Sequence, residues 1–401
     1  MFSQISIKIA GCFLLINTVA CGGGSDPAPI QPTQPPVVVV PQPELFHCSN
    51  DTTCPEIIIS GAPHAGDAFR GYGDPSLEFD EPTNTLWLTY SWLNVLISDP
   101  NPPIEFDLGV RTHLAKSIDG GNSFEFVKEI NTPEIEAHPD TGVQGWSTHE
   151  VPTLLKQPDD SWQLLWFKYF NPLGTIAGVD ERQEFLYWRT LSSTPEDLGT
   201  NSEVWARAAA ASTSWNAPID LNTISEISDC TVMTEPALFA FNNDVYLTSS
   251  CLVVDSTGRR TDLERLVLLK EVNNDYEFIG TILDSADAAD LGVDVIQQAD
   301  ISVARDGSII MIVTPIILTN DPDHQGCIVF EFDDFSNASI KRGSNGQALA
   351  RNIITADGNG LGPGLCTYDA ASESGVMLVI VTVSQNGTDV EFSLRATGVH
   401  P

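Results

Sequence analysis

The chain of 401 residues has few basic side chains: 19 lysines and arginines stand against 54 aspartates and glutamates, a formal net charge of −35. It lacks a basic stretch that would neutralise phosphates, which argues against nucleic acid as a partner. The same negative field disfavours sulfated or uronate polymers as ligands. Few lysines and many aspartates also suit a salty habitat, which concerns the environment and not the activity.

Long apolar runs are missing as well. No segment after the N-terminal region approaches the roughly 20 residues of a transmembrane helix. Lys8 precedes the apolar run 9–20, which is too short for a span and has the length of a signal-peptide core. Small residues then lead to Cys21, and this junction resembles the bacterial lipobox. An ordinary cleaved signal with an unmodified cysteine is the alternative.

The N-terminal features predict three parts of the chain. Residues 1–20 form a signal peptide, residues 21–45 a lipidated cysteine with a tether rich in glycine and proline, and residues 46–401 a folded domain. Gly22 stands where an aspartate would resemble an inner-membrane retention signal. We therefore expect an exported lipoprotein of the outer membrane or cell surface, which touches the membrane only through its lipid.

Zinc-type and redox-type C-x-x-C spacings are absent. Apart from Cys12 in the signal and Cys21, an even number of cysteines remains, as expected of structural disulfides in an oxidising compartment. The sequence allows fifteen pairings. We prefer the pairs that join near neighbours in the chain, which are Cys48–Cys54, Cys230–Cys251 and Cys327–Cys366.

Nucleotide loops, zinc motifs and a nucleophile elbow are also missing, so phosphoryl transfer and serine-hydrolase chemistry have little support. Convincing helical patterns are rare, and the best candidates are the segments 284–294 and 194–211. Nearly every apolar segment is instead a short strand bounded by Gly, Pro, Asn or Asp. The composition therefore predicts an all-β domain.

A unit recurs along the chain. It begins with a strand of the pattern acid-Pro-small-Leu or a relative, continues through a polar turn, and adds a second strand of β-branched and aromatic residues. Units spaced roughly 65 to 85 residues apart with four strands each are typical of a β-propeller. We expect a five-bladed β-propeller whose last blade is completed by the N-terminal segment 56–60, which closes the ring. A β-sandwich is the competing architecture. The units begin near Asp74, Glu150, Glu235, Asp300 and Cys366.

The segment 117–124, Ser-Ile-Asp-Gly-Gly-Asn-Ser-Phe, resembles the Asp-box of sialidase-type propellers. In those families its aspartate ties a hairpin turn far from the active site. We therefore interpret it as a marker of fold.

Acidic residues open the first strand in four of the five units, namely Asp74, Glu150, Glu235 and Asp300. First strands of a propeller line the central channel, so these carboxyls converge, and like charges raise each other's pKa. One protonated and one ionised carboxyl would then be available for general acid and base catalysis. The alternative is that each acid caps the entry of its strand by accepting backbone N–H groups.

Two of these positions resemble motifs of the five-bladed glycosidases of arabinanase and xylosidase type, glycoside hydrolase family 43. The motifs are Gly73-Asp74-Pro75-Ser76 and 234–239, the latter followed by 244–250. The resemblance implies that Asp74 activates water and that Glu235 protonates the leaving oxygen, with inversion. Glu150 or Asp300 would separate their pKa values. Glu235 meets proline directly, and Glu150 replaces the family's helper aspartate, so both motifs are imperfect.

Substrate contacts are expected near the strand starts. Tyr72, Trp146 and Tyr368 can stack on sugar rings, unless they are core aromatics, and His149 can bind a hydroxyl. Arg70 faintly resembles the first arginine of sialidases, which makes a sialidase-like exo-glycosidase a second enzymatic reading.

The main prediction is a monomeric surface glycosidase that acts on oligo- or polysaccharides and requires no cofactor. A propeller that binds glycan or a partner protein without catalysis is the alternative. The converging carboxylates could then hold calcium in the central channel. The metal content is left undetermined by the sequence.

Overall fold

Strands make up nearly all of the regular structure in the computed structural model. Signal peptide, Cys21 and most of the tether lie outside the described residues. None of the helices within the described part is long and apolar enough to cross a membrane. The described residues are 42–49, 51–63, 69–97, 106–108, 110–173, 183–210, 212, 214–255, 260–318, 322–357, 362–384 and 390–401.

The first and last repeat units share one sheet. The first unit is an antiparallel meander, and the last unit joins it because β26 pairs in parallel with β3 at Val390–Phe392. Its strands are β2 (Ile58–Ser60), β3 (Phe69–Asp80), β4 (Thr85–Ile97), β5 (Phe106–Leu108), β6 (Arg111–Ser117), β7 (Ser123–Glu129), β24 (Gly364–Thr367), β25 (Met377–Val383) and β26 (Val390–Ala396).

The second and third units form a sheet each. The second meander, β9 to β12, is extended by β8 beside its first strand and β13 beside its last. These strands are β8 (Glu134–Ala137), β9 (Gln144–Lys156), β10 (Trp162–Pro172), β11 (Gln183–Ser192), β12 (Ser202–Arg207) and β13 (Ile219–Asp220). The third meander consists of β14 (Val232–Phe241), β15 (Asp244–Leu252), β16 (Arg265–Val272) and β17 (Asp275–Leu283).

The fourth unit forms the remaining sheet. Its outermost strand, β23, pairs in parallel with β1 from the N-terminal side of the domain, a pairing that the sequence does not predict. The strands are β1 (Glu44–Cys48), β18 (Val295–Val303), β19 (Ile309–Leu318), β20 (Pro322–His324), β21 (Cys327–Asp334), β22 (Ser339–Ile340) and β23 (Ala350–Ala356).

The N-terminal segment 56–60 divides between two units. Glu56 bridges Arg395, and the Ile57 N–H donates to the Leu394 carbonyl at 2.9 Å, so the start of the segment contacts β26 of the last unit. The strand of the segment, β2, pairs in parallel with β7 of the first unit, not with the last unit as predicted. The segment thus contacts both the last and the first unit.

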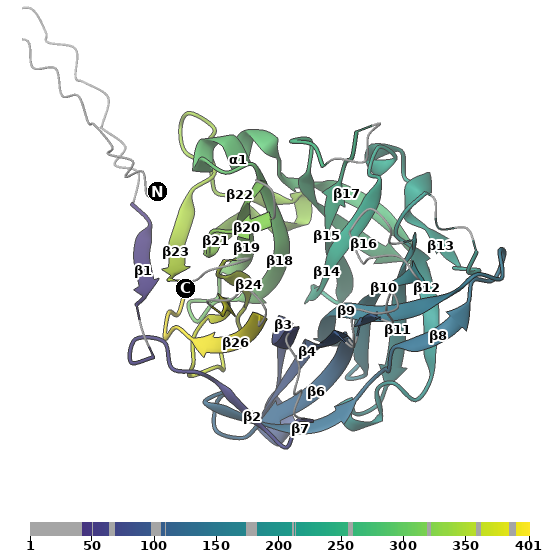
Figure 1. The fold of residues 1–401 in the computed structure, drawn as a ribbon. Coiled ribbons are helices and arrows are strands. Elements are labelled where there is room, and N and C mark those ends of the chain that lie inside the picture. The colour runs from purple at the N-terminus through teal and green to yellow at the C-terminus, as the bar shows by residue number, and fades with distance from the viewer. Residues whose placement is uncertain are drawn as a thin grey trace, which may run out of the picture. The chain divides into compact units, whose positions relative to one another are not determined.

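The first strands of the units lie together at the centre of the domain, with later strands farther out (Figure 1). β3 packs against β9, β9 against β14, and β14 against β18, while β24 packs against both β18 and β3. Apolar side chains fill the spaces between the sheets. The inner strands therefore enclose a shared channel.

Side chains tie neighbouring inner strands together. The Leu154 N–H donates to Ser76 Oγ at 3.2 Å, and the Leu238 N–H donates to Thr153 Oγ1 at 2.9 Å. The two acceptors, Ser76 and Thr153, lie two positions after Asp74 and Val151. Buried amides of inner strands need such acceptors because they face the channel rather than a partner strand.

The same tie returns from the last unit to the first. The Leu77 N–H donates to Thr367 Oγ1 at 3.2 Å, and the Tyr368 N–H donates to Asp300 Oδ2 at 3.2 Å. Only Ala237, at the equivalent place in the third unit, has no side-chain acceptor to offer. These contacts, called the inner ties below, link β3 to β9, β9 to β14, β18 to β24 and β24 to β3.

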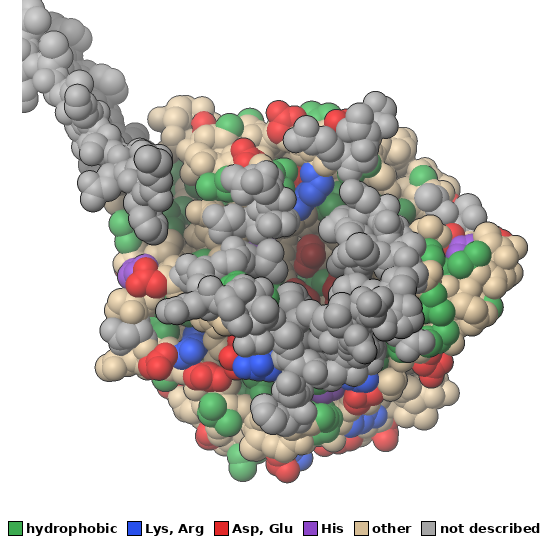
Figure 2. All heavy atoms as spheres, in the orientation of Figure 1, with side chains coloured by type: hydrophobic (Ala, Val, Ile, Leu, Met, Phe, Trp, Pro, Cys, Tyr) green, Lys and Arg blue, Asp and Glu red, His purple; other side chains and the backbone are tan. Residues whose placement is uncertain are grey.

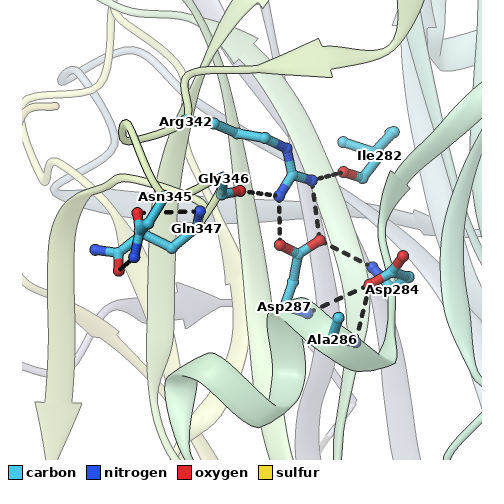
Figure 3. Close-up of polar contacts among 8 residues, drawn as sticks. All are labelled: Ile282, Asp284, Ala286, Asp287, Arg342, Asn345, Gly346 and Gln347. Carbon is cyan, nitrogen blue, oxygen red and sulfur yellow. Dashed lines mark hydrogen bonds and ion pairs between the residues drawn. The ribbon is translucent and has the colours of Figure 1, made fainter.

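The helix expected over 284–294 is present as α1 (Ser285–Leu291). Asp284 caps it, accepting from the amides of Ala286 and Asp287, and Arg342 pairs with both Asp287 oxygens at 2.6 and 3.0 Å (Figure 3). This acidic segment is therefore occupied by capping and by an ion pair.

The helix expected over 194–211 is wrong. Its residues form a short turn and then β12, whose alternating side chains pack against β11. The short 3-10 helices of the domain are η1 (Glu81–Thr83), η3 (Pro195–Asp197), η4 (Leu221–Thr223), η5 (Ser225–Ile227) and η6 (Phe335–Asn337).

The preferred disulfides are confirmed, with Cα–Cα distances of 5.4, 5.2 and 6.3 Å for Cys48–Cys54, Cys230–Cys251 and Cys327–Cys366. The segment that resembles an Asp-box lies in the turn between β6 and β7. Asp119 Oδ1 accepts from the Ser117 hydroxyl at 2.6 Å and from the Ser123 amide at 3.1 Å, within this turn.

Removing one inner tie should destabilise the domain. Thr153→Val keeps the shape of the side chain but leaves the buried Leu238 N–H without its acceptor, which costs about 1–3 kcal/mol. Chemical denaturation would measure the loss. Thr382→Val, the same change at an exposed position of β25, should stay within about 0.5 kcal/mol. Equal effects of the two changes would contradict the role of the ties.

Candidate functional site

Each inner strand contains a bulge at the same place. The register with the second strand shifts at Gly73/Ser76 in the first unit, and equivalent shifts occur in the other units. One residue in each bulge has a left-handed backbone although it is not glycine. These residues are Asp74 (φ 46°), Val151 (φ 52°), Glu235 (φ 53°), Gln298 (φ 50°) and Leu365 (φ 54°).

Such a conformation is costly, by about 1–3 kcal/mol per residue, and it gathers at functional sites. Val151 is the sharpest case, because β-branched residues rarely adopt positive φ. Bulges also re-aim side chains next to active sites. The five left-handed residues therefore form one ring of equivalent positions in the channel, and the ring carries three polar side chains: Asp74, Glu235 and Gln298.

Asp74 is half-buried and held by hydrogen bonds. Gln298 Nε2 donates to its Oδ1 at 2.9 Å, and Ser91 and the Val151 amide also contact its carboxyl group. Burial, followed by the negative charge of Glu150, raises the pKa of Asp74 to about 6 against the opposing effect of these donors. A carboxyl group with this pKa is mostly ionised at neutral pH and can accept a proton.

The other two acids of the front half of the channel lie on different strands. Glu235 is half-buried at the left-handed position of β14. It lies near Tyr187: burial is the main cause of the raised pKa of this phenol, and the charge of Glu235 adds to it. Glu150 precedes the left-handed position by one residue and accepts from the Tyr169 hydroxyl at 3.3 Å. The structure thus brings Glu150 to Asp74 although their backbone positions differ.

Asp300 does not belong to the ring. It lies two residues after Gln298, at the position of the inner ties, where it accepts from the Thr367 hydroxyl at 2.6 Å and from the Tyr368 and Ile301 amides. In the third unit Ala237 offers no acceptor to the next inner strand, and the Ile301 amide of that strand bonds to the Asp300 carboxyl instead. This is the strand-capping alternative considered above, and it explains Asp300 without catalysis.

A cavity of about 510 Å³ lies behind the ring. Three carboxyl groups line it, those of Glu78, Asp300 and Asp369. Burial raises the pKa of each, that of Asp300 to about 7, and Asp369 adds to the shift of Glu78. The channel acids are therefore divided by the bulges into a front set near Asp74 and this rear set.

The expected substrate residues are scattered. Tyr72 is half-buried against Tyr90 and Trp92, with ring centroids 5.3 and 5.4 Å away, and Trp146 is half-buried on β9. Tyr368 is only 1% exposed, so its ring is enclosed in the core and has no face for a sugar.

The two expected polar contacts are engaged within the protein. His149 is buried, accepts from Trp166 Nε1 at 2.8 Å, and has a pKa lowered to about 3 by burial and by Lys168. Arg70 pairs with Glu391 at 3.1 Å. These contacts do not bring the side chain of His149 or of Arg70 to Asp74.

A second polar cluster resembles a catalytic triad but cannot act as one. Ser214 Oγ lies 3.2 Å from His138 Nε2 and 3.1 Å from Glu184 Oε1. His138 Nδ1 accepts from the amides of Asp140 and Thr141, so the ring proton is on Nε2. The histidine therefore cannot take a proton from the serine.

Metal-ligand geometry gives no centre either. Within the described residues, the group of adjacent donors is Asp229, Cys230 and Cys251, and the two cysteines form a disulfide. They offer no thiolate to an ion.

Sequence reasoning missed Gln298 and Ser91. Aligning the repeat on the proline, rather than on the acid, would have placed Val151-Pro152-Thr153 beside Asp74-Pro75-Ser76. The fourth unit has no proline at this place, so the sequence carries no signal that aligns Gln298 with Asp74.

Figure 2 shows acidic side chains at the bottom of a hollow in the centre of the viewed face. No protein-family model matches the chain, and a search of curated proteins finds no match. Solved structures do match. A structure titled "Glycoside hydrolase" superimposes with a TM-score of 0.51 at 9% identity, covering 86% of this chain and 92% of the other.

Two further matches have lower TM-scores. A family 117 glycoside hydrolase of the marine bacterium Zobellia galactanivorans gives 0.49 at 9% identity, covering 85% of this chain and 88% of its own. A GH43_1 enzyme from Xanthomonas citri gives 0.47 at 12% identity, covering 86% and 90%. At these identities the likeness concerns the fold, and the chain shares the fold of the first of these glycoside hydrolases.

Asp300→Asn should change how stability depends on pH. The folded pKa of Asp300, about 7, exceeds the unfolded value, so its contribution is present at low pH and is lost as the pH rises through 7. Asparagine keeps an acceptor for the ties without this loss. Relative to wild type, the variant should gain about 2 kcal/mol between pH 5 and pH 8 in denaturant titrations.

Asp306→Asn is the matched control for this change. The Ser308 and Arg351 contacts of Asp306 hold its pKa far below its usual range, so its contribution is constant over the same interval. If the difference between Asp300→Asn and wild type is also constant, the titration assigned to Asp300 is wrong.

Proposed function

We propose that this protein is a glycoside hydrolase whose base is Asp74 and whose acid is Glu235. The carrying observation is that both carboxyls occupy equivalent left-handed bulge positions, on the first strands of the first and third units. Two acids presented by the same strained backbone into one channel are an expected arrangement for paired acid and base catalysis. The shared fold with a solved glycoside hydrolase supports the same conclusion.

The proposed reaction inverts the sugar. Asp74 takes a proton from water as the water oxygen bonds to the anomeric carbon, and Glu235 gives its proton to the departing glycosidic oxygen. Solvent then returns both carboxyls to their starting states. The contacts of Asp74 with Gln298, Ser91 and the Val151 amide favour its ionised form, as a base requires. The charge of Glu150 raises the proton affinity of Asp74.

The proposal includes the architecture and the location. We take the five meanders as blades of one propeller, because the inner ties and the β26–β3 pairing connect the last unit to the first. We take the protein to be a monomeric lipoprotein, anchored through Cys21, that cleaves oligosaccharides at the cell surface without a required cofactor.

The sialidase alternative gains no support, since that chemistry needs arginines gathered on a carboxylate. Among the described arginines, Arg70 pairs with Glu391, Arg111 with Glu129, and Arg189 with Glu203. The non-catalytic binding protein, with or without calcium, is the alternative that the next experiment addresses.

Amide substitutions should abolish cleavage. Asp74→Asn and Glu235→Gln each remove one proton-transfer group, and kcat/KM should fall by about 10²–10⁴-fold. The measurement is hydrolysis of a panel of aryl glycosides and of marine and plant oligosaccharides.

Glu78→Gln is the matched control, because Glu78 lies on β3 in the rear cavity with its pKa well above the usual range, mainly through burial. It should keep full activity. If wild type cleaves nothing on the panel while both site variants fold like it, the binding-protein alternative replaces the glycosidase.

Cys21→Ser should release the protein from the membrane. The thiol is the only atom that can accept the thioether-linked lipid in the proposed lipobox, so fatty-acid labelling of the expressed protein should disappear and the protein should move to the soluble fraction. Cys12→Ser, inside the signal core, should leave both results unchanged. Persistent labelling of Cys21→Ser would show that lipidation at this residue is wrong.

A further inference from the structure

Gln298 is the polar residue of the left-handed ring that has no proton-transfer role in the proposed mechanism. Its side chain reaches across the channel from β18 to β3, and Nε2 donates to Asp74 Oδ1 at 2.9 Å. The backbone N–H of Gln298 donates to Ser250 Oγ at 3.2 Å, which fixes the backbone of the bulge. The side chain therefore starts from an anchored, strained position and ends on the proposed base.

The amide group of Gln298 has a defined orientation. The Leu365 N–H donates to Thr314 Oγ1 at 2.9 Å, and the Thr314 hydroxyl donates to Gln298 Oε1 at 3.4 Å. The ionised Asp74 carboxyl group can only accept, so Nε2 is the atom of Gln298 that faces it, and Oε1 faces Thr314. Thr314 accepts from the Leu365 amide and has its one proton available for this oxygen.

A matching chain approaches Asp74 from the other side. The Val151 N–H donates to Ser91 Oγ at 2.8 Å, and Ser91 in turn hydrogen-bonds to the Asp74 carboxyl. Two backbone amides thus begin two donor chains, one through Ser91 and one through Thr314 and Gln298. Both chains end on the Asp74 carboxyl group. In each chain, every group donates its hydrogen bond to the next group on the way to that carboxyl group.

We infer that Gln298 is a positioning residue for Asp74: oriented by Thr314, it donates to Oδ1 and thereby holds the carboxylate in place and in its ionised form. Donors on a carboxylate favour its ionised form. Burial and Glu150 act in the opposite direction, so the glutamine keeps the base available near neutral pH. The inference rests on the proposed function for the reaction, but the orientation and its effect on Asp74 stand without it.

Among the described ionisable groups, Glu150 on β9 is the one whose charge acts on Asp74. Tyr90 on β4, next to Ser91, contacts His113 and Tyr72 instead. β26 contributes Glu391, which faces Arg70 instead. The strands β24 and β25 carry no ionisable group within their described residues, since Cys366 is in a disulfide.

The test measures the titration of Asp74 directly. The mature chain carrying Cys21→Ser is labelled with ¹³C at the aspartate carboxyls, and the Asp74 signal is the one missing from Asp74→Asn. Gln298→Leu should raise its midpoint by about one unit from the wild-type value near 6, a tenfold change in proton affinity.

Thr314→Val should raise the midpoint by a smaller amount, because the glutamine amide can then turn its oxygen to Asp74. Thr314→Ser restores the hydroxyl and should restore the wild-type midpoint. Thr314→Val and Thr314→Ser together test the inference if Gln298→Leu does not fold. An unchanged Asp74 midpoint in Gln298→Leu, or in Thr314→Val where the former cannot be measured, would overturn the inference.

Gln297→Leu is the matched control on the same strand. Gln297 Nε2 donates to Glu264 at 3.3 Å, not to Asp74, so this change should leave the Asp74 midpoint unmoved. Where a substrate is cleaved, the acid limb of kcat/KM should move with the midpoint in Gln298→Leu, which a purely structural loss would not produce. A shifted midpoint with no cleavage by wild type would reject the glycosidase and keep the orientation of Asp74.

Discussion

The need to satisfy backbone amides at the channel is the constraint on which the rest of the structure depends. Beyond its bulge, an inner strand has one edge without a ladder partner, and its buried N–H groups there must find acceptors. Ser76, Thr153 and Thr367 supply hydroxyl oxygens to the neighbouring inner strand, and Asp300 supplies a carboxylate. These contacts determine how far apart the inner strands lie, and hence where any side chain in the channel can reach.

The bulge in each inner strand follows from the same requirement. It interrupts the ladder for one residue and turns that residue into the left-handed region, so its side chain enters the channel from a fixed backbone. Asp74, Glu235 and Gln298 are presented in this way, and Val151 and Leu365 complete the ring with apolar groups. The strain is distributed over all five inner strands, whereas the polar chemistry is confined to three of them.

The acidic residues of the channel have two different roles, which the composition alone does not distinguish. Asp300 is a structural acceptor whose burial raises its pKa, while Asp74 is surrounded by donors that oppose the same effect of burial. Several carboxyls gathered in one channel would repel one another if all were ionised. The bulges divide them into a front and a rear set, so the proposed base retains its charge while the rear acids bind protons more readily.

From the sequence alone followed the all-β class, the repeat with the approximate positions of its strands, the disulfide pairs and the choice of Asp74 and Glu235 as candidate catalytic residues. These depend on local patterns: alternation, turn residues, and cysteines near one another in the chain. The tertiary structure decided the register of the bulges, which moved Asp300 from the candidate catalytic set to the inner ties and brought Gln298 to Asp74. It also enclosed Tyr368 and placed β12, within 194–211, between β11 and β13. The physical reason is that each of these depends on a partner from another sheet, and local patterns carry no record of which strand lies across the channel.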